Sequence, residues 1–281
     1  MTPPAAPAGH DTGYAKINLA LHVRRRRPDG YHELETLFAF AEDGDRLSAQ
    51  PANTLSLTLS GPFAHELESG PGNLVMRAAE ALRTANGIMA GAALHLEKVL
   101  PVAAGLGGGS ADAAATLRLL SALWGLGADA VRPGDLAAEL GADVPACIAS
   151  RTCFGTGVGD QLSPVEGREL SGVPLLLVNP LLACPTGPVF KAWDGEDRGP
   201  LSPDMWMEAR NDLETPAISL IPDIAIVLDA LRARPGVRLV RMSGSGATCF
   251  ALFDDGHARD AAADDLRAEH PGWWVLTSRL R

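Results

Sequence analysis

Residues 100–120, LPVAAGLGGGSADAAATLRLL, place four glycines close together and then continue as an alanine- and leucine-rich helix pattern. A glycine turn before a helix is suited to bind an anion, because the first N–H groups of a helix lack partners and the helix dipole favours negative charge there. Glycine also lets the backbone approach phosphate oxygens closely. We therefore predict phosphate binding by the backbone at Gly105, Gly107, Gly108 and Gly109.

Two common phosphate-binding loops do not fit this segment. A Walker loop ends in Lys followed by Ser or Thr, whereas here Ser110 is followed by Ala111 and the loop contains no lysine. A dinucleotide-binding loop needs a third glycine where Ser110 stands, and residues 131–136 offer no second strand with a ribose-binding acid. A purely structural tight turn remains the alternative to phosphate binding.

A lysine and an asparagine in the amino-terminal strand pattern are further candidates. Residues 14–23, YAKINLALHV, alternate with a period of two, as a half-buried strand does, so that Lys16 and Asn18 share one face. Only three of the 24 basic residues are lysine, namely Lys16, Lys98 and Lys191, and a retained lysine can mark a need for a compact ammonium. From the pattern alone, Lys16 is predicted to be an exposed strand residue, and chance retention of lysine stays open.

The composition excludes several classes of protein. Hydrophobic residues make up 46% and charged residues 21%, as in a folded globular protein. No apolar run approaches the roughly 20 residues that a membrane helix needs. The formal net charge of −10 disfavours general nucleic-acid binding, because a phosphate backbone would be repelled. The basic run 24–27 is interpreted as a solvated strand end or as a contact for an anion or nucleotide.

The four cysteines and the amino terminus bear on the compartment. Cys147, Cys153, Cys184 and Cys249 lack the close paired spacings of zinc sites, and we predict reduced thiols in the core. Residues 1–12 have neither the basic nor the apolar region of a signal peptide and are predicted to be a disordered tail. We therefore expect a cytoplasmic protein.

The elements that must position these residues fall into two groups, since 281 residues suit two medium domains. In the first group, Asn73 is the expected cap of a helix that Gly87 ends. We expect strands over residues 31–42, 47–50, 55–59 and 92–99, and helices over 74–85, 110–124 and 133–140, before a further element that starts at 141–145.

The second group begins at about residue 156. Its expected elements are a strand at 175–178, a helix at 224–234, strands at 238–242 and 249–253, a helix at 258–269 and a strand at 274–278. This order is the split βαβ arrangement of ferredoxin-like domains. A Pro- and Gly-rich insertion at about 180–222 interrupts it, and long insertions often carry a binding site.

Three motifs, in this order and at these distances, carry a resemblance to a known family. They are AKIN at 15–18, PVAAGLGGGSADAAA at 101–115 and MSGSGATCF at 242–250. They resemble the motifs of the GHMP kinases, a group of small-molecule kinases. The resemblance implies an α+β fold of two domains: an ATP-binding domain over 13–155, similar to domain 2 of ribosomal protein S5, and a ferredoxin-like domain over 156–281.

Two further segments narrow the resemblance within that group. DGYHELETLF at 29–38 and GADVP at 141–145 are similar to the branch that acts on a cytidine diphosphate derivative of methylerythritol. The resemblance implies ATP-dependent phosphorylation of the 2-hydroxyl of that small molecule, in the non-mevalonate route to isoprenoid precursors. It implies neither a nucleic-acid nor a membrane partner, and we expect a monomer or a weak homodimer.

The resemblance assigns two catalytic residues. Asp143 matches the family's general base, and a carboxylate suits the removal of a proton from a tertiary alcohol as the phosphoryl group is transferred. Lys16 matches the lysine that keeps this carboxylate ionised and faces the moving phosphoryl group. A helix cap is the alternative role for Asp143.

The remaining assignments concern the two substrates. Asn18, Tyr31, His32, Phe190, Gly244 and Ser245 match substrate-binding positions, with Tyr31 and Phe190 on either side of the cytosine. ATP is assigned to Lys98, Pro101, Val102, Ala103, Ala104, Gly105, Leu106, Gly107, Gly108, Gly109 and Ser110. The alternatives are packing for Tyr31, core for Phe190, a solvated strand residue for Lys98, and a flexible hairpin for residues 243–247.

Departures from the family pattern affect the metal site. Tyr14 stands where proline is usual, and Ala111 replaces a common second serine, which leaves Ser110 as the only loop hydroxyl for a phosphate or Mg²⁺. We expect a Mg²⁺–ATP complex with no dedicated metal ligand besides Asp143. Asn211 and Asp212 also recur in the family pattern, without an assigned role. Another kinase of the group, or an RNA-binding module that uses the basic run, remain the competing interpretations.

Overall fold

The computed structural model describes residues 9–127, 132–165 and 170–281, and within them the chain forms two compact units. The first comprises residues 1–15, 44–102 and 108–149, and the second residues 16–43, 103–107 and 150–281. The long strands β1 (Gly9–Arg26) and β2 (His32–Ala52) each contribute one part to each unit. The domain limits 13–155 and 156–281 therefore stay a prediction.

The predicted tail is too long, because β1 begins at Gly9. Asp11 explains why residues 9–12 are ordered: its carboxylate accepts hydrogen bonds from Arg118 at 2.9 Å, and Arg118 also donates to the carbonyl of Thr12 at 2.9 Å. The rest of the predicted tail, residues 1–8, lies outside the described residues.

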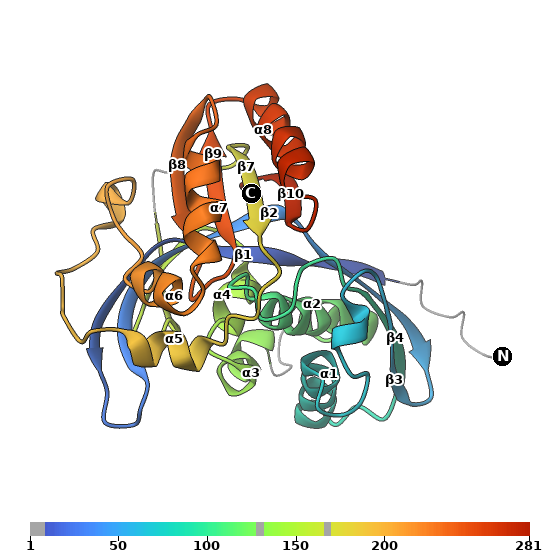
Figure 1. The fold of residues 1–281 in the computed structure, drawn as a ribbon. Helices are drawn as coiled ribbons and strands as arrows, with labels where there is room; N and C mark the ends of the chain where they lie inside the picture. Colours follow the sequence, from blue (N-terminus) through green and yellow to red (C-terminus); the bar gives the residue numbers. More distant parts are fainter. Residues whose placement is uncertain (1–8, 128–131, 166–169) are drawn as a thin grey trace. The chain divides into compact units, whose positions relative to one another are not determined.

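The described residues of the first unit form strands and helices, most of them close to the positions that the sequence pattern predicts (Figure 1). Strand β3 (Leu55–Ser60) is parallel to β4 (Gly91–Glu97), which pairs antiparallel with residues 46–52 of β2. The helices are α1 (Leu74–Ala85), α2 (Gly108–Leu123), α3 (Pro133–Leu140) and α4 (Val144–Ala149), with a short 3-10 turn at Ala64–Glu66. Asn73 caps α1 as predicted, since its side chain accepts from the N–H of Val75 at 2.9 Å.

In the second unit, two strands that sequence patterns did not reveal extend the sheet beyond β2. Residues 36–38 of β2 pair antiparallel with β5 (Cys153–Thr156), and β5 pairs with β6 (Gln161–Pro164). Both strands are four residues long, which is too short for a period of two to stand out.

The rest of the second unit confirms the ferredoxin-like prediction. Its elements are β7 (Pro174–Asn179), α7 (Asp223–Arg232), β8 (Val237–Met242), β9 (Cys249–Phe253), α8 (Gly256–Glu269) and β10 (Trp274–Arg279). The strands form one antiparallel sheet in the order β10-β7-β9-β8, which is the order of a split βαβ fold. The insertion contains α5 (Thr186–Ala192), a 3-10 turn at Pro203–Met205 and α6 (Glu214–Leu220).

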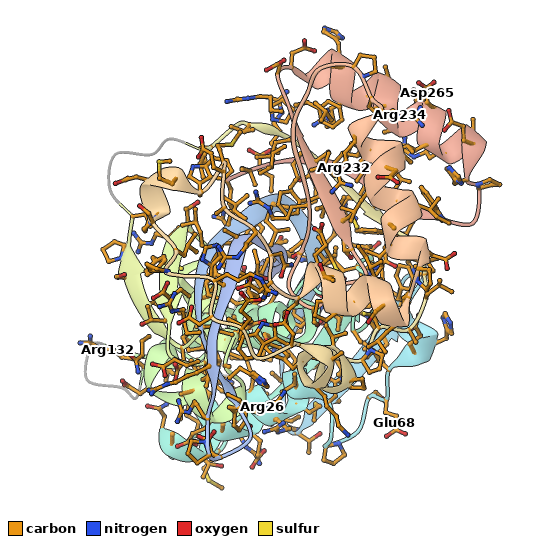
Figure 2. The ribbon with its side chains drawn as sticks, turned by 60° about the vertical axis from the view of Figure 1, so that its left-hand side comes forward. Arg26, Glu68, Arg132, Arg232, Arg234 and Asp265 are labelled. Carbon is orange, nitrogen blue, oxygen red and sulfur yellow. The ribbon has the colours of Figure 1, made fainter. Side chains whose placement is uncertain are left out.

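Helices α7 and α8 cover one face of this sheet. Alternate strand residues such as Leu176 and Val178 share a buried core with both helices. Arg234, just after α7, forms ion pairs with Asp265 and Glu269 of α8 (Figure 2). All four cysteines are buried and free, as predicted, and no helix among the described residues is long and apolar enough to cross a membrane.

Candidate active site

The glycine bend of residues 103–107 contains two positions whose backbone conformation favours glycine. Gly105 and Gly107 have φ of +76° and +61°, in the left-handed region that disfavours other residues. At Gly105 space is also lacking, since a Cβ would lie 2.4 Å from the carbonyl oxygen of Ser243. Helix α2 begins at Gly108, two residues before the predicted start. The bend therefore leads directly into the free N–H groups of a 16-residue helix.

Backbone and side-chain hydrogen bonds join the bend to the other two motifs within the second unit. The N–H of Lys16 donates to the carbonyl of Leu106 at 2.9 Å, and the N–H of Thr248 donates to that of Ala104 at 3.2 Å. The hydroxyl of Ser243 donates to the carbonyl of Gly105 at 2.9 Å. Segments that are far apart in the sequence thus meet at three consecutive residues, Ala104, Gly105 and Leu106.

Lys16 and Asn18 are buried, so the prediction of an exposed strand residue at position 16 is wrong. The ammonium of Lys16 donates to the side-chain oxygen of Asn18 at 2.9 Å and lies 5.4 Å from the centre of the Phe38 ring. Asn18 is fixed in turn, because its amide nitrogen donates to Thr36 Oγ1 at 2.8 Å. The N–H of Asn18 donates to Ser243 Oγ at 3.2 Å, which links the first motif to the third.

Asn211 organises the third motif, a role that the sequence did not reveal. Its side-chain amide donates to the carbonyls of Met242 and Gly244, both at 2.8 Å. Its oxygen accepts from the N–H of Leu213 at 2.9 Å, so all its polar atoms are used. The neighbouring Asp212 accepts from the N–H of Val23 at 2.8 Å and ties the same segment to β1. Asn211 therefore holds the loop of residues 243–247, which argues against the alternative of a flexible hairpin.

Gly244 and Ser245, predicted to bind substrate, lie in this held loop. Gly244 has φ of +57°, and a Cβ there would lie 3.2 Å from the side-chain oxygen of Asn18. Ser245 is buried, and its hydroxyl lies 3.0 Å from that of Thr186 in α5. The insertion thus reaches the third motif.

An aromatic group forms where the second strand and the insertion meet in the second unit. The rings of His32 and Phe190 have centres 4.9 Å apart, and Trp193 lies edge-on to His32 at 5.7 Å. Burial, with a smaller contribution from the charge of Arg26, lowers the pKa of His32, which keeps the ring neutral at pH 7. Sequence reasoning did not predict Trp193, which directly follows the last residue of α5.

Tyr31 lies beside this group in the sequence and is 63% exposed, so packing does not explain an aromatic residue there. Its backbone is nevertheless fixed in the turn. The N–H of Tyr31 donates to Asp29 Oδ1 at 3.0 Å, and its carbonyl accepts from the N–H of Arg27 at 2.7 Å.

In the first unit, Asp143 precedes α4, and its carbonyl accepts from the N–H of Cys147 at 3.1 Å. The same segment lies beside the start of α2, since a Cβ on Gly141 would lie 3.8 Å from Ser110 Oγ. Arg118 of α2 also donates to the carbonyl of Cys147 at 2.9 Å. The predicted base and the predicted phosphate-binding serine therefore belong to adjacent segments of one unit.

Lys98 is 2% exposed, which excludes the solvated strand residue considered above. Its ammonium is paired with Asp45 and Asp112, both of which are buried. Both acids belong to the first unit, as Lys98 does. No sequence pattern indicated this pairing.

The basic run 24–27 is largely neutralised by acidic residues of its own unit. Arg24 lies 3.0 Å from Asp197, Arg25 pairs with Glu33, and Arg27 lies 2.8 Å from Asp29. Arg26 donates to the ring of His32 at 3.3 Å. These ion pairs support the interpretation of the run as a strand end.

The described residues contain no group of three or more His, Cys, Asp or Glu side chains that could hold a metal ion.

Comparison with known families now gives these features a context. The model described as "GHMP kinases N terminal domain" matches residues 73–151, and that described as "GHMP kinases C terminal" matches residues 194–272. The chain belongs to the GHMP kinase family and has its α+β fold.

Closer relatives carry a more specific name. A protein of Rhizorhabdus wittichii named 4-diphosphocytidyl-2-C-methyl-D-erythritol kinase is 57% identical, over 98% of this chain and 96% of its own. One of the same name from Novosphingobium aromaticivorans is 54% identical, over 96% and 92%. A crystal structure of 4-(cytidine 5'-diphospho)-2C-methyl-D-erythritol kinase is 39% identical with a TM-score of 0.82, over 97% and 99%. Methanococcus jannaschii mevalonate kinase, 12% identical with a TM-score of 0.66 over 99% of both chains, shares the fold.

Proposed function

We propose that this chain catalyses ATP-dependent phosphorylation of the 2-hydroxyl of 4-diphosphocytidyl-2-C-methyl-D-erythritol, which yields the 2-phosphate and ADP. The reaction is a step of the non-mevalonate route to isoprenoid precursors. The observation that carries the proposal is the meeting of the three kinase motifs at residues 103–107, through Lys16, Ser243 and Thr248.

The phosphates of ATP are assigned to the backbone from the bend to the start of α2. The N–H groups of residues 107–110 have no partner four residues earlier in the helix, so they are free to donate to phosphate oxygens. The hydroxyl of Ser110 is the additional donor. Mg²⁺, bound to the phosphates, would neutralise the charge that develops during transfer, and Ser110 is the loop hydroxyl available to it.

Asp143 is assigned as the general base. It accepts the proton of the 2-hydroxyl while the alcohol oxygen forms a bond to the γ-phosphorus and the bond from that phosphorus to the β–γ bridging oxygen breaks, which releases ADP. Lys16 is assigned to stabilise negative charge during this step. Its burial and its hydrogen bond to Asn18 support the role, because they fix the position of the ammonium within the first motif.

The cytidyl group is assigned to the aromatic residues. Tyr31 offers an exposed ring and Phe190 a partly buried one, and both suit stacking on a base. The neutral ring of His32 and the amide of Asn18 provide directional hydrogen bonds. Gly244 and Ser245 supply a backbone that can approach the substrate closely.

The remaining assignments concern partners, compartment and oligomeric state. The net charge of −10 argues against a nucleic-acid partner. We also propose that the reaction takes place in the cytoplasm and that the enzyme is a monomer or a weak homodimer.

A coupled ADP-release assay across candidate alcohols tests the proposal. The cytidyl substrate, mevalonate and homoserine are compared at saturating Mg²⁺–ATP. Turnover of the cytidyl substrate alone is expected. Turnover of a non-nucleotide alcohol, with none of the cytidyl substrate, would contradict the proposal.

A further inference from the structure

Asp45, Lys98 and Asp112 form a buried charged cluster in the first unit. The Nζ atom of Lys98 lies 2.6 Å from Asp45 Oδ2 and 2.7 Å from Asp112 Oδ2, and the exposed fraction of each side chain is 4% or less. Asp45 lies in β2, Lys98 directly follows β4, and Asp112 lies in the second turn of α2. The cluster therefore joins the strand that leads toward the glycine bend to the helix that follows it.

On the strand side, the cluster fixes the backbone just before Pro101. Asp45 Oδ1 accepts hydrogen bonds from the N–H groups of Val99 and Leu100, at 2.7 and 2.9 Å. The N–H of Lys98 itself donates to the carbonyl of Ser60 at 2.8 Å. One carboxylate thus binds both the ammonium and the backbone of the segment that follows β4.

On the helix side, the ammonium lies directly against the first residue of α2. A Cβ on Gly108 would lie 3.0 Å from Lys98 Nζ, so the glycine lets the backbone pass close over the lysine. Asp112, the fifth residue of the helix, accepts from the same ammonium. The other oxygen of Asp112 is buried with no hydrogen-bond partner among the described residues. An unpaired buried acceptor costs about 1–3 kcal/mol. The ion pair with Lys98 offsets this cost and holds the carboxylate of Asp112 in place.

The charge of the cluster argues for a geometric role. Burial lowers the pKa of Lys98, but the charges of Asp112 and Asp45 outweigh burial and raise its pKa. Burial raises the pKa of Asp112 to about 7, against the opposing charge of Lys98. One ammonium shared by two carboxylates has no positive charge left to attract a phosphate. The cluster can instead fix where the backbone donors lie.

We propose that Lys98 is a positioning residue for the phosphate-binding backbone, and that it sets the distance between the end of β4 and the start of α2. The proposal rests on the proposed function, because it takes the N–H groups at the start of α2 to bind the phosphates of ATP. It differs from the assignment of Lys98 to direct contact with ATP, for example with the base. Hydrogen bonds weaken steeply with poor geometry, so a small shift of these donors weakens phosphate binding.

Binding of adenosine, ADP and a non-hydrolysable ATP analogue separates these two roles. The main variant is Lys98→Met/Asp45→Asn/Asp112→Asn, which removes every charge of the cluster but keeps the side chains nearly isosteric. Replacing a buried ionic group by neutral residues is often neutral or stabilising, so a folded protein is expected. Asp112→Asn is the milder second variant, since its amide oxygen still accepts from Lys98.

A matched control lies on the same two strands. Arg46 and Glu97 are each adjacent to a cluster residue, and they form an exposed ion pair with an N–O distance of 3.2 Å. The variant Arg46→Met/Glu97→Gln neutralises this pair without touching the cluster. Circular dichroism and urea unfolding establish that each variant is folded.

The dissociation constants of ADP and the ATP analogue should rise at least about tenfold in the triple variant and about threefold in Asp112→Asn. Those of adenosine, and of all ligands for the control, should stay within about twofold. Unchanged ADP affinity in a folded variant would overturn the proposal. Equal weakening of adenosine and ADP would also overturn it, in favour of contact with the base. Wild-type protein that binds ATP but does not phosphorylate the cytidyl alcohol would contradict the proposed function alone.

Discussion

A buried ammonium and two carboxylates link β2, the end of β4 and α2 in the first unit, whereas neutral hydrogen bonds join the motifs of the second unit. In the first region two carboxylates, those of Asp45 and Asp112, share one ammonium, Lys98 Nζ. In the second region Asn18, Asn211 and Ser243 each make separate contacts, most of them with backbone carbonyls and N–H groups.

The difference has an energetic consequence. A neutral hydrogen bond contributes about 1 kcal/mol net, so the second region should lose stability in small steps. Removing one partner of a buried ionic group costs about 3–5 kcal/mol, because a charge is left without compensation. The first region should therefore respond to a single substitution far more strongly than the second.

The largest effect on activity is expected for Asp143→Asn in the first unit. The variant keeps the shape of the side chain but cannot accept the proton, so kcat should fall by about 10²–10⁴. Nucleotide affinity should stay nearly unchanged, since the base acts only in the chemical step. Steady-state kinetics and ADP titration measure both quantities, and retained turnover would remove Asp143 from this role.

The largest effect on stability is expected for Lys98→Met, which leaves two buried carboxylates without their ammonium. The free energy of unfolding in urea should fall by about 3–5 kcal/mol. The triple neutral variant should recover most of this loss. A loss below about 1 kcal/mol for Lys98→Met would mean that the two regions do not differ.

Asn211→Ala tests the neutral region. It removes the donors to Met242 and Gly244, and stability should fall by about 1–3 kcal/mol. The KM for the cytidyl substrate should also rise, because the loop of Gly244 and Ser245 loses its support. Asn73→Ala is the control: it removes a helix cap at a cost of about 1 kcal/mol and should leave this KM unchanged. An equal KM effect in both variants would contradict a specific role for Asn211.

Tyr31→Ala should affect binding without affecting stability. Loss of stacking on the base should raise the KM for the cytidyl substrate about tenfold, within the range measured for base–aromatic contacts. The free energy of unfolding should change by less than about 0.5 kcal/mol, since the side chain is 63% exposed. Tyr31→Phe keeps the ring and should be close to wild type. An unchanged KM in Tyr31→Ala would leave the residue without a role in recognition.

A final prediction concerns the pH dependence of stability. Burial raises the pKa of Asp112 from 3.8 to about 7, so between about pH 4 and 7 the folded protein binds more protons than the unfolded chain. Its free energy of unfolding therefore falls through Asp112 as the pH rises over this window. Asp112→Asn lacks this contribution, so its stability relative to wild type should increase from pH 5 to pH 8. A constant difference in urea unfolding would contradict the shift.

Local sequence patterns predicted the order of elements in the second unit, but they did not predict the side-chain contacts of the first unit. The order of strands and helices was sufficient for the ferredoxin-like fold, and Asn73 was recognisable as a cap, because both depend on neighbours in the sequence. Lys98 was not recognisable as buried, because its partners Asp45 and Asp112 are 53 and 14 residues away. Asn211 likewise contacts residues about 30 positions distant. Such contacts depend on tertiary structure, and the local periodicity of the sequence carries no information about them.

The most direct test of the account is a crystal structure with a non-hydrolysable ATP analogue. We predict that its phosphates accept hydrogen bonds from the backbone N–H groups between Gly107 and Ser110, at the start of α2. A phosphate chain bound elsewhere in the crystal would contradict the central claim.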